Sequence, residues 1–311
     1  MNPLPRLHAW LIRYEVRKGG ILPPLPTTAF HGALARALYD KACVAPARAT
    51  CTGCPAEPCC AYPALFEPAP AERSQMRELG VTTEVPRPLV ISPDQPFLPT
   101  GEEPLPVRAG QIVAFRIAAT DKVWHHWNLL RQALDLVGRR GLGARETRVL
   151  LRLIDVQALA STPPNFDGGG ITLRFVTPLR IKHRGKIASE IDGPLLVSAI
   201  LRRARLLAEL TGKPWVGDDR AERWAASLES VADLKLVRVG RYSGRQERWM
   251  LWPGLVGSLR LRGEGLGALL PLLHFGSLAQ IGKATTFGFG RYELSLAAEA
   301  HDTKTPRLEG A

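Results

Sequence analysis

Residues 171–182 have the sequence ITLRFVTPLRIK, in which β-branched and aromatic residues favour a β-strand. Residues 7–18, LHAWLIRYEVRK, are rich in strand formers in the same way. A helical pattern follows each stretch, from Thr27 to Tyr39 in the first case and over residues 194–210 in the second. The two halves of the chain therefore open alike, and the rest of each half can be compared element by element.

The same order of elements continues in both halves. In the first half we expect strands at 86–92, 111–119 and 147–159 and a helix at 123–137 that stops at Gly138. In the second half we expect hairpin strands at 231–239 and 248–262, a helix at 266–280 and a strand at 288–296. Strand–helix–strand–strand–helix–strand is the ferredoxin-like order. The prediction is an α+β chain of two tandem ferredoxin-like domains with RRM-like βαββαβ topology, each an antiparallel sheet with helices on one face.

A turn-rich joint separates the halves. Residues 161–170 contain two prolines and three consecutive glycines, a composition typical of a domain boundary. We therefore predict a first domain over residues 1–160 and a second over 168–311. The first carries a Cys/Pro-rich insertion at about 43–85.

The length and composition are those of a folded globular protein. The chain has 311 residues, of which 45% are hydrophobic and 23% charged. These values exclude a disordered or fibrous protein. No apolar run reaches the ~18–20 residues that span a bilayer, and the first ten residues lack a signal-peptide pattern. We expect a cytoplasmic protein with no membrane partner.

The charge is strongly basic in both halves. Lys and Arg number 41 against 29 Asp and Glu, which gives a net charge of +12. Since both halves share the excess, it is not a basic tail on a neutral domain. A polyanion, most simply a nucleic acid, is the expected partner. The alternative explanation for the basic charge is a source organism whose proteins are generally rich in Arg.

A glycine-rich segment lies near the C-terminus, between an expected helix and strand. It contains Gly282, Lys283, Gly288 and Gly290. Glycine lets a backbone approach a phosphate closely, and successive N–H groups can form an anion nest. The order of a P-loop is absent. Ordinary turn chemistry is the alternative interpretation.

Two basic stretches have the composition of phosphate-contacting loops. The first holds Lys182, His183, Arg184 and Lys186, for which a solvated loop is the alternative. The second, residues 238–262, interleaves six arginines with aromatic residues, and Arg241, Tyr242 and Arg245 are its predicted RNA contacts. At strand spacing Trp249 and Trp252 lie on opposite faces, so at least one belongs to the core.

All five cysteines lie between Cys43 and Cys60. An odd, clustered set without a signal peptide argues against a disulfide framework. A C-x-x-C pair with outlying cysteines can surround a structural zinc ion tetrahedrally. Reduced thiols or a labile disulfide are the alternatives.

Residues 281–294, IGKATTFGFGRYEL, resemble the C-terminal glycine-rich loop of the RAMP superfamily of CRISPR-associated proteins. The closest likeness is to its CRISPR repeat RNA-processing endoribonucleases. It extends to other stretches, namely FHGALARAL at 30–38, CTGCPAEPCCAYPALF at 51–66, LRFVTPLRIK at 173–182 and RYSGRQER at 241–248.

The resemblance implies an activity. Such enzymes cut CRISPR precursor RNA within repeats without a metal ion, by attack of a 2′-hydroxyl on the adjacent phosphorus. The products are a 2′,3′-cyclic phosphate and a 5′-hydroxyl. This chemistry needs a base, an acid and cations around the phosphorane. The expected partners are repeat RNA, crRNA and a CRISPR effector complex.

The resemblance also implies roles for particular residues. It places His31, expected in the first turn of the first helix, as the catalytic histidine, with Tyr39 and Lys41 as assistants. A capping or packing role is the alternative for His31. The family's loop makes Lys283 and Arg291 RNA contacts. The family's insertion favours Cys43, Cys51, Cys54 and Cys60 as zinc ligands and leaves Cys59 spare.

A non-catalytic alternative accompanies this prediction. Relatives with the same fold and loop hold guide RNA inside effector complexes without cutting it. A DNA-binding regulator is a weaker third hypothesis, because no helix-turn-helix pair is evident in the sequence.

Overall fold

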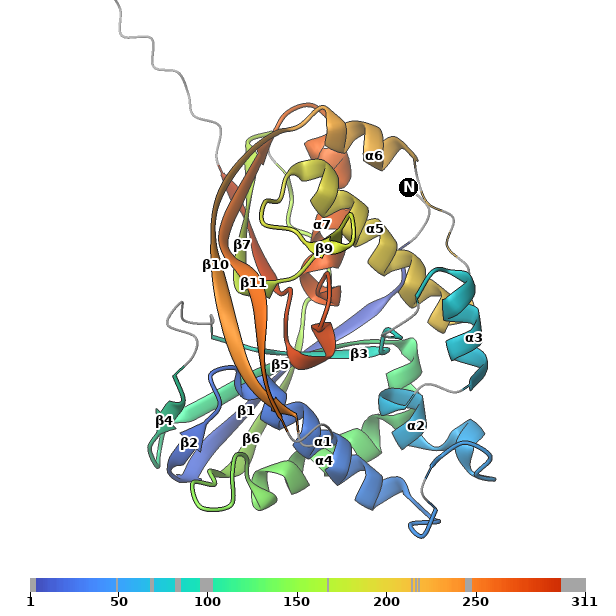
Figure 1. Cartoon of the computed structure of the whole chain (residues 1–311), viewed down its shortest axis with the longest axis vertical. Helices are drawn as coiled ribbons and strands as arrows, with labels where there is room; N and C mark the ends of the chain where they lie inside the picture. The colour runs from blue at the N-terminus through green and yellow to red at the C-terminus, as the bar shows by residue number, and fades with distance from the viewer. Residues whose placement is uncertain are drawn as a thin grey trace, which may run out of the picture.

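The computed structural model describes residues 4–48, 50–67, 70–81, 85–95, 103–166, 168–213, 215, 217, 219–243 and 248–297. Two antiparallel sheets, one above the other in Figure 1, account for the two halves.

The first sheet has the strand order β3–β5–β1–β6. Its strands are β1 (Leu7–Lys18), β3 (Leu89–Pro93), β5 (Ile112–Thr120) and β6 (Leu150–Leu159). Helices α1 (Pro26–Ala42) and α4 (Trp127–Arg140) contact each other and pack against the sheet. Alternate residues of β1, Ile12 and Tyr14 among them, enter the core with Phe30 and Phe115. The core of this half thus lies between one sheet face and the two helices.

The second sheet repeats the arrangement with the order β10–β11–β7–β12. Its strands are β7 (Gly170–Leu179), β10 (Glu229–Ser243), β11 (Arg248–Arg262) and β12 (Tyr292–Ala297). Helices α5 (Gly193–Leu210), α6 (Asp219–Ala226) and α7 (Leu266–Ala279) lie beside the sheet in Figure 1. In both halves the second strand is at one edge and the first and third are central. The predicted tandem ferredoxin-like fold is therefore confirmed.

Shorter elements fill the connections. They are β2 (Gly20–Leu22), α2 (Ala61–Phe66), α3 (Pro70–Glu78), β4 (Leu105–Val107), β8 (Lys182–His183) and β9 (Lys186–Ile187), with 3₁₀ turns η1 (Glu57–Cys59), η2 (Asp121–His126) and η3 (Thr285–Phe287). Among the described residues, no helix is both long and apolar enough to cross a membrane.

Several predicted boundaries are wrong, and three of them have a clear local cause. Helix α1 begins at Pro26, one residue before the predicted start at Thr27, because the fixed φ of proline suits a first helical position, and Leu25 is the cap residue. Helix α4 continues through Gly138 and is capped at Gly141, which has a φ of 78°. Strand β12 begins at Tyr292 rather than at residue 288, because the preceding residues form a 3₁₀ turn and a loop.

The two halves make direct contacts. Leu278 of α7 packs against Ala9, Val90 and Ala118 on the face of the first sheet that α1 and α4 leave uncovered. The β10–β11 hairpin extends from the second half toward α1 (Figure 1), and Leu25 joins a cluster that includes Val237 of β10. The start of α1 therefore lies at a junction between the two halves.

Candidate functional site

His31 lies against the glycine-rich segment of the other half. Its ring centroid is 5.1 Å from that of Phe287 in η3 and 5.3 Å from that of Phe66 in α2, both with edge-on geometry. Since α1 begins at Pro26, His31 stands in the second turn rather than the predicted first turn. The free N–H groups of the helix end are a turn away, so the electrostatic argument from the helix N-terminus does not apply to His31 directly.

Thr27 holds this junction together. It is fully buried, and its hydroxyl donates a hydrogen bond of 2.7 Å to the carbonyl oxygen of Phe287. Gly288 follows with a φ of 94°, and a Cβ atom there would stand 2.3 Å from the Thr27 hydroxyl oxygen. Glycine at 288 thus allows α1 and the loop to approach each other closely.

The other two glycines serve contacts within the second half. A Cβ on Gly282 would stand 2.4 Å from the Arg180 carbonyl oxygen, and one on Gly290 would stand 1.9 Å from that of Ile281. The backbone N–H groups of residues 281, 283 and 287–291 donate to protein acceptors. The predicted anion nest is therefore wrong for these amides, because the loop uses them to pack against its own half.

Aromatic rings pack against the glycine-rich segment. The Trp252 ring centroid lies 5.6 Å from that of Phe287 and 5.7 Å from that of Phe289. The Arg180 guanidinium lies 5.1 Å from the Trp252 ring centroid. Trp252 is thus packed in the junction. The sequence alone assigned no role to Phe287 or Arg180, since only the fold brings Phe287 to His31 and Arg180 to Trp252.

Tyr39 and Lys41 lie at the opposite end of α1. Tyr39 is eight residues beyond His31, about 12 Å along the helix axis. Its hydroxyl donates to the Pro46 carbonyl oxygen, and its ring contacts Tyr62. A hydrogen bond with Cys43 is the main cause of its raised pKa. Lys41 is exposed at the helix end. The structure does not bring these two side chains to His31.

Part of the first basic stretch converges with the glycine-rich segment. Lys182 and His183 line a pocket together with Gly282 and Lys283. Arg184 and Gly185 form the two-residue turn between β8 and β9, both with positive φ, as such hairpins require. Arg184 and Lys186 are exposed there and do not line the pocket.

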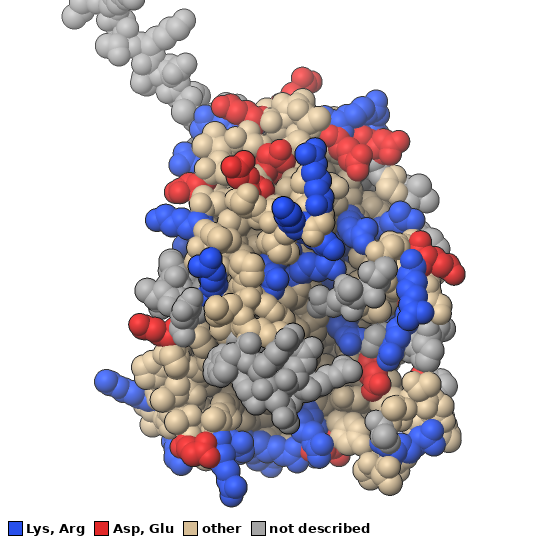
Figure 2. All heavy atoms as spheres, viewed as in Figure 1, with Lys and Arg blue, Asp and Glu red and all other residues tan. Residues whose placement is uncertain are grey.

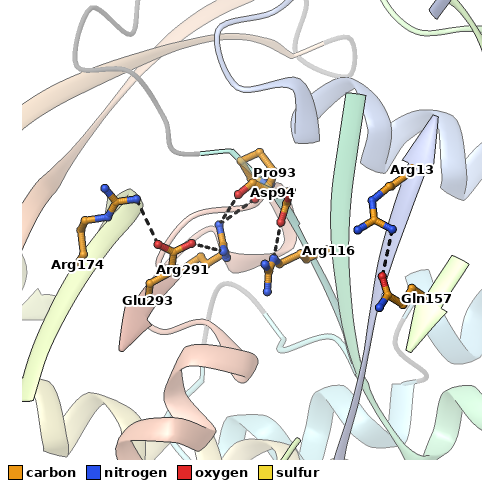
Figure 3. Close-up of polar contacts among 8 residues, drawn as sticks. All are labelled: Arg13, Pro93, Asp94, Arg116, Gln157, Arg174, Arg291 and Glu293. Carbon is orange, nitrogen blue, oxygen red and sulfur yellow. Dashed lines mark hydrogen bonds and ion pairs between the residues drawn. The ribbon is translucent and has the colours of Figure 1, made fainter. Parts of the chain in front are cut away.

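Arg291 is not on the surface. Its side chain is 4% exposed and donates to the carbonyl oxygens of Pro93 and Asp94 and to the Glu293 carboxylate (Figure 3). Glu293 also pairs with Arg174. Burial is the main cause of the lowered pKa of Arg291. Its prediction as an RNA contact is corrected: it joins β12 to the end of β3.

The remaining predicted RNA contacts cannot be placed. Arg241 and Tyr242 continue β10, opposite Met250 and Trp249, but their side chains lie outside the described part of the structure. Arg245 lies outside the described residues altogether.

The cysteines gather at the far end of α1. Cys43, Cys51 and Cys54 line one pocket with Tyr62 and Glu67. Burial first, and a hydrogen bond with Glu67 second, raise the pKa of Cys51 to about 12. Burial is also the main cause of the raised pKa of Cys60, to which nearby Cys43 and Cys54 add.

Cysteine thiolates are suitable ligands for zinc, but these cysteines do not converge on one point in the structure. Among the described residues, no group of three or more His, Cys, Asp or Glu side chains is placed to hold a metal ion, and none of the five cysteines forms a disulfide.

Charge is unevenly spread over the face in Figure 2. Acidic side chains gather at the end that carries α6, whereas Lys and Arg side chains cross the middle, beside α5 and β9. The middle of this face is therefore basic, and further Lys and Arg side chains gather along its lower edge in Figure 2.

Two family models match the chain. Residues 4–166 match the model AF_1859_N, described as an N-terminal domain, and residues 173–292 match the CRISPR-associated endoribonuclease Cas6. The second half of the chain therefore matches the Cas6 family of CRISPR-associated endoribonucleases. The glycine-rich segment lies inside the Cas6 match and His31 inside the other.

Solved structures show the same fold at low identity. A Cas6 product complex has a TM-score of 0.56 at 18% identity and covers 93% of this chain and 100% of its own. Thermus thermophilus Cas6 has a TM-score of 0.52 at 16% identity, and the match covers 94% of this chain and 100% of the Cas6 chain. A chain of a partial Cas6-RT-Cas1–Cas2 complex has a TM-score of 0.56 at 12% identity, and the match covers 96% of this chain and 47% of that longer chain. No curated protein matches this chain.

Proposed function

We propose that this protein is an endoribonuclease that cuts CRISPR precursor RNA within repeats, with no metal ion in the reaction. The contact between His31 and Phe287 carries the proposal. It sets a titratable side chain from the first half against the glycine-rich segment of the second, next to a basic pocket. The match of residues 173–292 to the Cas6 endoribonuclease model supports RNA processing as the role of this junction.

The proposed reaction is an internal transesterification. The 2′-oxygen of one nucleotide attacks the adjacent phosphorus, and the bond from phosphorus to the 5′-oxygen of the next nucleotide breaks. The 2′-hydroxyl loses its proton to a base, and the leaving 5′-oxygen gains one from an acid. The products are a 2′,3′-cyclic phosphate and a 5′-hydroxyl, and no water enters.

His31 is proposed to transfer one of these protons. An imidazole has a reference pKa of about 6.5, so both of its protonation states are available near neutral pH. Tyr39 and Lys41, the two other predicted catalytic residues, have no part in this step, since they lie two turns along α1.

The second candidate function is a non-catalytic subunit that holds guide RNA within a CRISPR effector complex. The packing of His31 between two aromatic rings favours this alternative, because a packed histidine need not react. The same basic pocket would serve both functions.

One experiment separates the two. Purified protein is incubated with a repeat RNA in EDTA, and the products are mapped. We expect a single cut and a cyclic phosphate on the 5′ fragment. RNA that is bound and left intact would establish the binding subunit instead. Products with 3′-hydroxyl ends would contradict the proposed reaction while leaving nuclease activity in place.

A further inference from the structure

A pocket of about 220 Å³ lies between α5, the β8–β9 hairpin and the first part of the glycine-rich segment. Its charged lining is entirely basic: Lys182, His183, Arg202, Arg203 and Lys283. None of its lining residues that the structure describes is Asp or Glu. These cations come from three separate segments, so only the fold assembles them.

Arg203 makes this pocket more than a group of surface lysines. Its residue is only 6% exposed, and its Nε donates a hydrogen bond of 3.2 Å to the Ala279 carbonyl oxygen. An anion that reaches a guanidinium in such a position forms strong charge-assisted hydrogen bonds, because little water competes for it. Its neighbour Arg202 is exposed at the pocket.

Hydroxyl groups and apolar side chains complete the lining. Ser198, Thr285 and Thr286 supply hydroxyls that can donate to phosphate oxygens. Apolar residues, Val81, Val85 and Leu195 among them, form part of the wall. The lining thus has a charged part and an apolar part. A phosphate with its attached sugar, which has a charged group beside a less polar one, would fit both parts.

The pocket is distinct from the His31 contact. Its lining includes Thr285 and Thr286 but neither His31 nor Phe287. The next residue along, Phe287, contacts His31 and Trp252 instead. The short η3 turn thus places Thr285 and Thr286 at the pocket and Phe287 at His31.

We propose that this pocket binds one phosphodiester group of the RNA at a position other than the bond that is cut. The inference rests on the proposed function for the identity of the RNA. The pocket therefore contributes affinity, whereas His31 contributes rate. Arg202 and Arg203, which sequence reasoning did not name, are RNA-positioning residues in this view.

Arg202→Ala and Arg205→Ala test the proposal as a matched pair. Both arginines are exposed on α5 and both changes remove one charge, but only Arg202 lines the pocket. For Arg202→Ala we expect about tenfold weaker repeat-RNA binding, and a salt slope reduced by about 1. The single-turnover rate at saturating RNA should not change. Arg205→Ala should alter the affinity less than about twofold.

Equal effects of the two variants on affinity would overturn the proposal, because net charge alone would then explain them. A lower rate at saturation with unchanged affinity for Arg202→Ala would also overturn it, by moving the pocket to the cut bond. If wild-type protein binds repeat RNA without cutting it, the proposed function fails but the affinity contrast still decides the pocket.

Inorganic phosphate is the second probe. At equal ionic strength it should raise the Tm of wild-type protein more than that of Arg202→Ala. If phosphate does so while both variants bind RNA equally, the pocket takes a free anion, and the assignment to RNA is wrong.

Discussion

The Thr27 hydroxyl donates a hydrogen bond of 2.7 Å to the Phe287 carbonyl oxygen, across 260 residues of sequence. It ties the start of α1 to the glycine-rich segment, one turn of helix before His31. The position of His31 relative to the second half therefore depends on a bond between the halves rather than on α1 alone.

Replacement of Thr27 by Val tests this tie. Val keeps the shape of the side chain but leaves the part-buried Phe287 carbonyl oxygen without the Thr27 donor, at a cost of about 1–3 kcal/mol in the free energy of unfolding. We expect a lower Tm and slower single-turnover cleavage. Thr27→Ser retains the hydroxyl and should stay close to wild type in rate. Equal rates for Thr27→Val and Thr27→Ser would show that the bond does not position His31.

His31→Ala should slow single-turnover cleavage by ~10²–10⁴-fold, the usual contribution of a positioned acid or base. RNA affinity should change by less than about tenfold. His125→Ala is the control, because His125 is exposed in η2 and no described contact joins it to the glycine-rich segment. A folded His31→Ala protein that cuts at the wild-type rate would remove His31 from the reaction. A tenfold or larger loss of affinity with an unchanged saturated rate would make it an RNA contact.

The fold could be predicted because its signals are local and occur twice. Strand-forming stretches and helical patterns follow one another in the same order in each half, and that order allows few sheet topologies. Boundaries were less certain because they depend on single residues. Pro26 starts α1 one residue earlier than Thr27 suggests, and Gly138 fits inside α4, where its missing side chain leaves room for Tyr14.

The site could be predicted only in part. His31 and Lys283 stand in segments with recognisable patterns, but the residues around each of them come from elsewhere in the chain. Phe287 and Arg203 look like ordinary loop and helix residues until the fold places them beside His31 and in the basic pocket. Arg291 shows the converse, since an arginine in a basic glycine-rich segment suggests a surface contact and only its carbonyl partners reveal a buried one.

Gly290→Ala should destabilise the protein more than Gly185→Ala. Both glycines have positive φ, 76° and 84°, so each change carries the left-handed backbone strain of about 1–2 kcal/mol. Only at Gly290 would the new Cβ also meet protein backbone, 1.9 Å from the Ile281 carbonyl oxygen, whereas nothing lies within 4 Å at Gly185. Urea unfolding of both variants measures the difference. Equal losses would mean that the loop relaxes freely around residue 290.

Arg291→Met should lower the free energy of unfolding by about 1–3 kcal/mol, because the buried Pro93 carbonyl oxygen and the part-buried Asp94 carbonyl oxygen lose their donor. Arg174→Met removes an exposed partner of the same Glu293 and should cost less than about 1 kcal/mol. Denaturant unfolding gives both values. Weaker RNA binding by fully folded Arg291→Met protein, without loss of stability, would restore the original prediction of an RNA contact.

Zinc analysis decides the role of the cysteine cluster. If Cys43, Cys51, Cys54 and Cys60 are ligands, freshly purified, reduced protein should contain about one zinc ion per chain. Cys51→Ser should lose most of it, and Cys59→Ser, the control, should keep it. Structural zinc stabilises a segment too short to form its own core, so chelation should increase proteolysis of the insertion. RNA cleavage should persist, since zinc takes no part in the proposed reaction. Equal metal content in the two serine variants, or no zinc in wild type, would exclude the proposed ligand set.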